Sequence, residues 1–396
     1  MEVNAEGRVL RVIDRVAPIA GNDLVLSLDM ELQKIAEQGL GEFSGSVVAV
    51  EPDTGAVVVF VSKPSFDPNL FVHGISHKDY DALQYGPYKP LFNRGLFGQY
   101  PPGSTLKPFI GLAGIEQRRM GVRESIFCKG HYLLPGDETQ RKYRDWKKWG
   151  HGNVDLSASI EESCDVYFYE LAHRMGIKSM HDFLAQFGFG NKTGIDLLGE
   201  RSGLLPSAEW KKRKYGKVWY PGETLIAGIG QGYMLSTPVQ LAVATAALAS
   251  RGEIIVPRLL REVHVSNEDT VKTREPSRNQ IKLRRDKNWD IVFSAMRKVV
   301  HGRSGTARAT GVGMKYKMAG KTGTAQVFGI GQDEEYDEET IAKKLRDHAL
   351  FVGFGPIEKP VLAVAVVAEN GGSGSGMAPV ARDVIQRYIE KFSEAR

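Results

Sequence analysis

Apolar positions form near-continuous runs at both ends of the chain and follow a helical spacing between them. Two runs, at 46–50 and 57–61, lie on either side of the tetrad Pro52-Asp53-Thr54-Gly55, which is turn-forming and predicts a hairpin. Two more runs, at 349–355 and 361–369, flank a segment bounded by prolines and predict a second hairpin. Strands that are apolar on successive residues are typical of a sheet covered on both faces.

Helices are predicted where apolar residues recur every three or four positions. The segments with this spacing are 155–175, 180–187, 238–249, 289–300 and 379–392. A further helix is expected after Asp29, which is a suitable N-cap for the pattern formed by Leu32, Ala36 and Leu40.

The order of these elements predicts the fold class. Two strands precede the helical block and three follow it, because residues 314–328 also have an extended pattern. This order predicts a mixed α/β (α+β) fold, in which helices flank a five-stranded antiparallel sheet and a large helical subdomain covers roughly residues 110–300. The active-site cleft is expected between the sheet and that subdomain. The polar segments 267–287 and 333–344 are expected to be loops.

Length and composition allow one large or two ordinary globular domains, since 42% of the 396 residues are hydrophobic. The longest apolar runs, near 241–248 and 361–368, are too short to cross a bilayer. Basic residues alternate with aromatic ones at 141–149 and 210–219, but no nucleic-acid-binding motif accompanies them. We therefore expect no nucleic-acid partner, and interpret these stretches as a solvated face or a face toward anionic glycan peptide or lipid head groups.

Candidate chemistry is concentrated in residues 101–107, Pro-Pro-Gly-Ser-Thr-Leu-Lys. The prolines and the glycine predict a sharp turn, and Ser104 is expected to open the apolar helix that follows. Lys107 lies three residues later, on the same helix face and within reach of the Ser104 hydroxyl. The unpaired N–H groups at the start of the helix favour an oxyanion, which fits a serine nucleophile with a lysine base. The structural alternative is a capping serine beside a solvated lysine.

Two later motifs favour the catalytic interpretation. Ser163-Cys164-Asp165 and Lys321-Thr322-Gly323 follow Ser104 in chain order, and this order is the signature of penicillin-binding proteins and class A β-lactamases. A second Lys-Thr-Gly occurs at 192–194. Because it lies in a turn-rich connection, we interpret it as structural, whereas 321–323 lies in the extended stretch.

Longer runs extend this likeness over nearly the entire chain. They are 101–104, 143–152, 194–197, 228–233 and 321–328. With them, the chain resembles the transpeptidase domain of the penicillin-binding protein 2 family, the class B D,D-transpeptidases of rod-shape elongation in Gram-negative bacteria. The resemblance implies the penicillin-binding/serine β-lactamase-like transpeptidase fold. Residue 165 is Asp where most of the superfamily has Asn, which leaves open whether this side chain donates a hydrogen bond or only accepts one.

The resemblance implies peptidoglycan D,D-transpeptidation, in which stem peptides are crosslinked through a serine acyl-enzyme formed on D-Ala-D-Ala. β-Lactams are expected to acylate the same serine. The chemistry needs no cofactor. The expected catalytic residues are Ser104, Lys107, Ser163, Asp165 and Lys321, and the expected substrate-binding residues are Thr322, Gly323 and Thr324.

Most of these residues have an expected role. Asp165 is expected to help hold Lys107 and to orient the substrate amide. Lys107 accepts the Ser104 proton, and Ser163 relays a proton to the leaving amine. Lys321 attracts the terminal carboxylate of the substrate. By resemblance, the backbone N–H groups of Ser104 and Thr324 stabilise the oxyanion.

The sequence also allows two other functions. One is a D,D-carboxypeptidase or β-lactamase-type hydrolase on the same scaffold, and the other is a non-catalytic penicillin-sensing or scaffold protein. Family members carry an N-terminal membrane anchor and a pedestal domain, so residues 1–42 are expected to be a linker from a missing pedestal and 43–396 the transpeptidase domain. The resemblance places the protein at the periplasmic face of the inner membrane. It implies a SEDS-family glycosyltransferase and rod-shape complex proteins as partners through the missing N-terminal region.

The only two cysteines predict a second site. In an extended or turning loop, Cys164 points away from the cleft that Ser163 and Asp165 face, and Cys128, Asp145 and His151 precede it. Two thiolates, an imidazole and a carboxylate are a suitable donor set for a closed tetrahedral zinc site. Family members hold zinc with a similar cluster, which implies a structural zinc here. A Cys128–Cys164 disulfide and two buried free thiols remain alternatives.

Overall fold

The structure is a computed structural model that describes residues 1–265, 271–272, 275–327 and 341–394. It contains two compact units, Met1–Ser27 with Leu260–Glu275, and Leu28–Leu259 with Pro276–Arg396. The first unit holds two small antiparallel sheets. Their strands are β1 (Glu2–Val3) with β2 (Val9–Arg11), and β12 (Val271–Lys272), β11 (Leu260–His264) and β3 (Asp23–Leu26).

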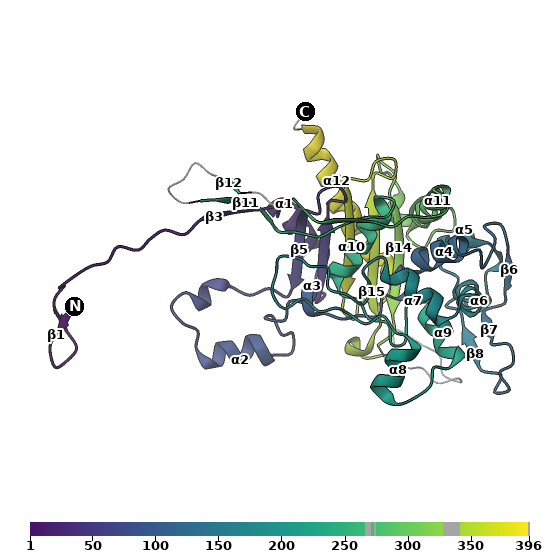
Figure 1. The fold of residues 1–396 in the computed structure, drawn as a ribbon, viewed down its shortest axis with the longest axis horizontal. Helices are drawn as coiled ribbons and strands as arrows, with labels where there is room; N and C mark the ends of the chain where they lie inside the picture. The colour runs from purple at the N-terminus through teal and green to yellow at the C-terminus, as the bar shows by residue number, and fades with distance from the viewer. Residues whose placement is uncertain (266–270, 273–274, 328–340, 395–396) are drawn as a thin grey trace. The chain divides into compact units, whose positions relative to one another are not determined.

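The second unit is built on a five-stranded antiparallel sheet (Figure 1). In spatial order its strands are β14 (Ala319–Ala325), β15 (His348–Gly355), β16 (Leu362–Ala368), β4 (Gly45–Val50) and β5 (Val57–Lys63). Both predicted hairpins and the predicted sheet are therefore confirmed. Every residue of β16 is fully buried, so the sheet is covered on both faces, as its continuous apolar strands predict.

Several helices pack on the sheet, among them α11 (Lys287–His301) on β14. α10 (Pro238–Ala249) packs on β16 and β4, and α12 (Ala378–Glu394) packs on β15 and β16. α1 (Met30–Gly39) packs against both α12 and β5. The Asp29 side chain accepts hydrogen bonds from the first backbone N–H groups of α1, which confirms the predicted cap. All twelve residues of α10 are buried, as expected for a helix that is apolar on every side.

The helical subdomain contains a break that periodicity did not predict. The segment 155–175 is two helices, α5 (Leu156–Glu161) and α6 (Asp165–Met175), instead of one. Between them Ser163 has a φ of +60°, a left-handed conformation that ends a helix of L-residues. The other helices of the helical subdomain are α4 (Lys107–Glu116), α7 (Ile177–Ala185), α8 (Ala208–Tyr215), α9 (Pro221–Gly228) and α11 (Lys287–His301).

Short elements complete the second unit. They are α2 (His77–Tyr85), α3 (Arg94–Phe97), β6 (Ile126–Cys128), β7 (His131–Leu133), β8 (Lys142–Arg144), β9 (Gly152–Val154), β10 (Glu253–Ile255) and β13 (Arg278–Gln280). Most of the loop predicted at 333–344 and part of the one at 267–287 lie outside the described residues. No helix in the described part of the chain is long and apolar enough to cross a membrane.

Candidate active site

The turn that carries Ser104 is a short 3₁₀ helix, Gly103–Leu106, and α4 begins only at Lys107. The sequence placed Ser104 at the helix start; the structure places it one turn earlier. In a 3₁₀ turn the side chains at i and i+3 eclipse each other, so Ser104 and Lys107 still share a face. Gly103 has a φ of +53°, and a Cβ there would lie 2.5 Å from the Thr324 carbonyl oxygen. Only glycine allows the turn to approach the strand this closely.

Lys107 is fully buried and its Nζ is held by the break between α5 and α6. Its Nζ donates to the Ser163 carbonyl oxygen at 2.7 Å, to the Ser163 Oγ at 3.3 Å and to Asp165 Oδ1 at 2.7 Å. The left-handed backbone of Ser163 therefore forms part of the lysine's binding site. Strained residues of this kind persist where the surrounding structure fixes them, and they cluster at functional sites.

Asp165 acts in the structure as an acceptor through both oxygens. Oδ1 accepts from Lys107, and Oδ2 accepts from the Trp146 backbone N–H at 3.2 Å. An asparagine would turn its NH₂ group toward one of these donors, so a carboxylate suits this position better than an amide. Burial raises the pKa of the Asp165 carboxyl, although the charge of Lys107 opposes the shift.

Lys321 lies on β14, with its side chain fully buried. Its Nζ donates to the Thr322 carbonyl oxygen at 3.0 Å and to the Thr322 Oγ1 at 3.4 Å. Burial lowers the pKa of the Lys321 ammonium well below its usual value, the charge of Lys107 adds to that effect, and Asp165 opposes it. Lys107, Asp165 and Lys321 are all buried.

Gly323 and Thr324 bring β14 against the Ser104 turn. A Cβ on Gly323 would lie 2.7 Å from the Thr105 methyl group, so this glycine is needed for the close packing of the strand on the turn. Thr324, the next residue, is exposed. The structure thus brings together Ser104, Lys107, Ser163, Asp165, Lys321, Thr322, Gly323 and Thr324, which the sequence proposed as one site.

Sequence reasoning missed three residues that contact this site. Thr306 makes a 2.7 Å hydrogen bond with the Thr322 hydroxyl. The Gln231 amide donates to the Thr324 carbonyl oxygen at 2.9 Å, and the Gly230 carbonyl oxygen accepts from Gly103 N–H at 2.8 Å. The run at 228–233 carried part of the resemblance, but no site role was assigned to its residues; Thr306 had no motif signal.

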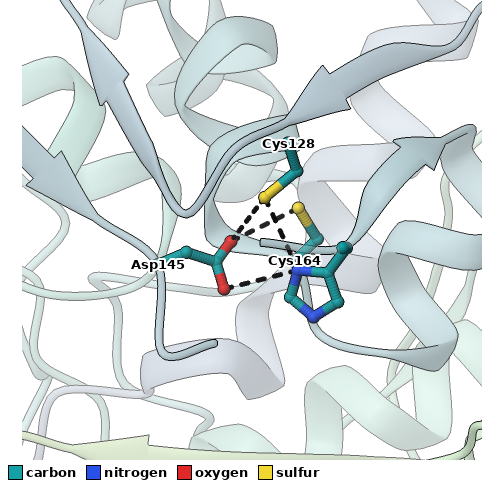
Figure 2. A group of neighbouring side chains, drawn as sticks. Cys128, Asp145 and Cys164 are labelled. Carbon is teal, nitrogen blue, oxygen red and sulfur yellow. Dashed lines mark hydrogen bonds and ion pairs between the residues drawn. The ribbon is translucent and has the colours of Figure 1, made fainter. Parts of the chain in front are cut away.

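The four residues of the predicted metal site lie together. Figure 2 shows the side chains of Cys128, Asp145 and Cys164 facing one another. One ligand atom from each of Cys128, Asp145, His151 and Cys164 lies within 4.8 Å of the others. Asp145 Oδ2 is 3.5 Å from the Cys128 sulfur and 3.4 Å from the Cys164 sulfur. His151 Nδ1 is 3.6 Å from the Cys128 sulfur and 3.4 Å from Asp145 Oδ1. Neither cysteine forms a disulfide.

These distances between ligand atoms fit a metal ion with tetrahedral coordination. Zinc lies about 2.3 Å from sulfur and about 2.0–2.1 Å from nitrogen or oxygen, so neighbouring ligands around it are roughly 3.5 Å apart. The side chains of Asp145 and His151 are fully buried. A hydrogen bond from Cys164 lowers the pKa of the Cys128 thiol to about 6, aided by one from His151 and opposed by burial.

The same carboxylate links the cluster to the catalytic turn. Asp145 Oδ2 accepts from the backbone N–H groups of Asp165 at 2.8 Å and Val166 at 3.1 Å. These are the first N–H groups of α6, so a negative charge is favoured there. Asp145 therefore fixes the start of α6 from behind while Lys107 contacts Asp165 from the cleft.

Comparison with known proteins gives a family match over most of the chain. The family described as "Penicillin binding protein transpeptidase domain" matches residues 45–386. Relatives named "Peptidoglycan D,D-transpeptidase MrdA" are 42% identical in Escherichia coli strain K12 and 44% identical in Acinetobacter baumannii, each over 98% of this chain. The chain spans 61% and 57% of the length of these two relatives.

Solved structures agree with this match. The PBP2 of Pseudomonas aeruginosa, crystallised with the compound WCK 5153, has a TM-score of 0.84 and 47% sequence identity, and the match covers 94% of this chain and 79% of that one. The PBP2 of Helicobacter pylori in its complex with MreC has a TM-score of 0.82 and 33% identity, covering 98% and 68% of the two chains.

Proposed function

This chain belongs to the penicillin-binding protein transpeptidase domain family, and from that premise we propose that it is a peptidoglycan D,D-transpeptidase acting through a Ser104 acyl-enzyme. The observation that carries the proposal is the buried Lys107, held by Ser163 and Asp165 on the same face as Ser104. A solvated lysine beside a capping serine would have none of these contacts. The geometry therefore favours the catalytic interpretation of the Ser-x-x-Lys motif.

The proposed reaction begins with proton transfer from Ser104 to Lys107 as the Ser104 oxygen attacks the carbonyl of a D-Ala-D-Ala peptide bond. The backbone N–H groups of Ser104 and Thr324 stabilise the oxyanion. Ser163, whose Oγ lies 3.3 Å from Lys107 Nζ, returns a proton to the leaving D-alanine amine. An amine of a neighbouring stem peptide then attacks the ester and releases Ser104.

Recognition of the substrate carboxylate is assigned to β14. Lys321 supplies positive charge, and the hydroxyl groups of Thr322 and Thr324 donate hydrogen bonds to the carboxylate. Gly323 leaves room for the extended peptide beside the strand. Since a β-lactam also carries a carboxylate next to a reactive amide, the same residues bind both ligands.

Covalent labelling tests this mechanism. After treatment with ampicillin, peptide mass spectrometry is expected to find one adduct per chain, on Ser104, and Ser104→Ala is expected to remain unlabelled. Lys107→Ala should slow acylation by roughly 10²–10⁴-fold, the usual contribution of a general base. Labelling of Ser104→Ala, or an unchanged rate in Lys107→Ala, would contradict the assignment. Rapid turnover of a chromogenic cephalosporin would favour the hydrolase alternative.

Location and partners are proposed from the relatives. One H. pylori relative was solved with MreC, and another structural neighbour, 30% identical, belongs to a structure described as a "peptidoglycan synthase complex". We accordingly propose that the protein works at the periplasmic face of the inner membrane with a SEDS-family glycosyltransferase and rod-shape proteins.

The cluster of Cys128, Asp145, His151 and Cys164 is proposed to hold one structural zinc ion. The ligand separations and the burial of the cluster support this assignment. Four protein ligands leave no open position for substrate, so the ion would brace the start of α6 and the Ser163 turn. The acylation chemistry itself requires no metal.

Elemental analysis of protein purified without added metal is expected to give about one zinc per chain. His151→Ala should lose the metal, lower the melting temperature and slow acylation, because the support behind Ser163 is weakened. His73→Ala, which alters an exposed histidine outside the cluster, is the control and should keep all three properties. Metal-free protein with a Cys128–Cys164 bridge in its peptide map would refute the site.

A further inference from the structure

Positive charge is concentrated in two short stretches that the catalytic mechanism does not use. Residues 141–149 and 210–219 contain ten of the 52 lysines and arginines and a single acidic residue, while the net charge of the entire chain is only +5. A Cβ on Gly222, at the start of α9, would lie 2.1 Å from the Tyr143 hydroxyl oxygen. The first stretch therefore lies against the residues that directly follow the second.

The cations at the end of α8 are solvent-exposed. Lys212, Arg213, Lys214 and Lys217 are all exposed, and within the described part of the chain none of them has an ion-pair partner. Their neighbour Lys211 behaves differently, because it is buried and contacts both carboxylate oxygens of Glu223, at 2.5 and 2.7 Å. Lys211 thus fixes α8 to α9, while the other four cations remain available to a ligand.

Aromatic rings lie among these cations. Tyr215 and Tyr220 are 50% and 56% exposed, so each keeps about half of its surface for a ligand. Tyr215 packs against Trp210 and Tyr233, with ring centroids 5.6 and 5.8 Å apart. The Lys211 ammonium lies 4.6 Å from the centroid of the Tyr220 ring. These contacts hold both rings in place, which reduces the entropy lost on binding.

Tyr233 connects this surface to the catalytic cleft. It lies two residues after Gln231, which binds the Thr324 carbonyl oxygen, and three residues after Gly230, which binds the Ser104 turn. Three residues further on, Ser236 pairs with Tyr100, just before that turn. Residues 230–236, which include the Tyr233 ring that packs against Tyr215, therefore also border the proposed nucleophile and oxyanion donors.

We propose that Lys212, Arg213, Lys214, Tyr215, Lys217 and Tyr220, here called the α8 face, bind the glycan strand whose stem peptide enters the cleft. This inference rests on the proposed function. A sugar ring presents an apolar C–H face that packs on an aromatic ring, and stem peptides carry carboxylates that exposed cations attract. Such a surface holds the polymer beside the cleft while a single stem peptide reaches Ser104.

Binding of soluble, uncrosslinked glycan strands tests the proposal. The charge variant is Lys212→Glu/Arg213→Glu/Lys214→Glu/Lys217→Glu. Its matched control is Lys282→Glu/Arg284→Glu/Arg285→Glu/Lys287→Glu, which reverses four exposed cations at the start of α11 and so changes the net charge equally. We expect strands with stem peptides to bind the charge variant about tenfold or more weakly, since several modest surface interactions are lost together, and the control within twofold of the unmodified protein.

A second variant, Tyr215→Ser/Tyr220→Ser, separates sugar stacking from charge. It should weaken binding both of intact strands and of strands stripped of their peptides by an amidase, whereas the charge variant should affect mainly the intact strands. Equal losses in the charge variant and its control, or unchanged binding in both α8-face variants, would overturn the proposal. The proposal would also be overturned if the charge variant lost binding to phosphatidylglycerol vesicles but still bound glycan strands, because the face would then be a lipid-binding surface.

Acylation by a fluorescent penicillin distinguishes this inference from the proposed function. Penicillin has no glycan, so every α8-face variant should acylate within about twofold of the unmodified rate, which also shows that the variant is folded. If the unmodified protein is not acylated at all, the proposed function is contradicted. If the α8-face variants are acylated normally and still bind strands as the unmodified protein does, only this inference is contradicted.

Discussion

The chain contains Lys-Thr-Gly twice, and the two copies have opposite environments. At 321–323 the motif lies on β14, where Lys321 is fully buried beside Lys107 and Asp165. At 192–194 it forms a turn in which Lys192 is exposed. There Thr193 donates from its backbone N–H and its hydroxyl to Glu200, both at 2.6 Å, and Gly194 N–H donates to the same carboxylate at 3.1 Å.

This difference shows what gives the motif its chemistry. In the turn, the threonine and glycine satisfy a carboxylate of the protein itself, and the lysine contributes nothing to that contact. On the strand, the lysine is buried, as are Lys107 and Asp165 of the proposed active site, and the threonine hydroxyl is held by Thr306. The same three residue types thus stabilise a turn in one place and are available for a substrate carboxylate in the other.

The sharpest test of the comparison replaces each lysine. Lys321→Ala is expected to slow β-lactam acylation by about a hundredfold or more, since loss of a buried charged partner costs about 2–5 kcal/mol. Lys192→Ala should leave the acylation rate within a few-fold of the unmodified protein. Stopped-flow or gel-based acylation with a fluorescent penicillin measures both. The reverse order of effects would show that the motif on the turn is the functional one.

Periodicity and motif order were sufficient to predict most of this architecture. Continuous apolar strands predicted the five-stranded sheet, and the run at 238–249 predicted α10 within its observed bounds. The structural interpretation of 192–194 agrees with its contacts to Glu200. The order of Ser104, the Ser163 motif and Lys321 predicted that these residues form one site, and the fold places Lys107, Ser163 and Lys321 in the buried interior.

What the sequence did not predict depends on single backbone conformations and distant contacts. Helical spacing continues through 155–175, so it gave no sign of the left-handed Ser163 that divides α5 from α6. The contacts of Gln231 with Thr324 and of Thr306 with Thr322 join residues from separate elements. No local pattern encodes such pairs, because the residues meet only after the chain has folded.

Glu200 should matter for stability alone, although it binds the second copy of the motif. Glu200→Ala leaves three donors of Thr193 and Gly194 without their acceptor in a buried position. We expect the free energy of unfolding to fall by about 1–3 kcal/mol, with the acylation rate at 25 °C unchanged. Urea unfolding measures the loss, and Glu42→Ala, at an exposed site, is the control. A slowed acylation with normal stability would mean that the turn at 192–194 reaches the active site.

The smallest expected effect concerns the hydroxyl partner that distinguishes Thr322 from Thr193, since Thr322 is bonded to Thr306 and Thr193 to Glu200. Thr306→Val removes the 2.7 Å hydrogen bond to the Thr322 Oγ1 and frees that hydroxyl to rotate away from the substrate carboxylate. One neutral hydrogen bond contributes about 1 kcal/mol, so second-order acylation should slow about fivefold, through weaker binding and not through a slower chemical step. Thr306→Ser keeps the hydroxyl and should restore the rate, which a purely structural role for the threonine methyl group would not allow. Thr193→Val should leave acylation unchanged and lower only the melting temperature, because its hydroxyl is bound to Glu200 and not to the site.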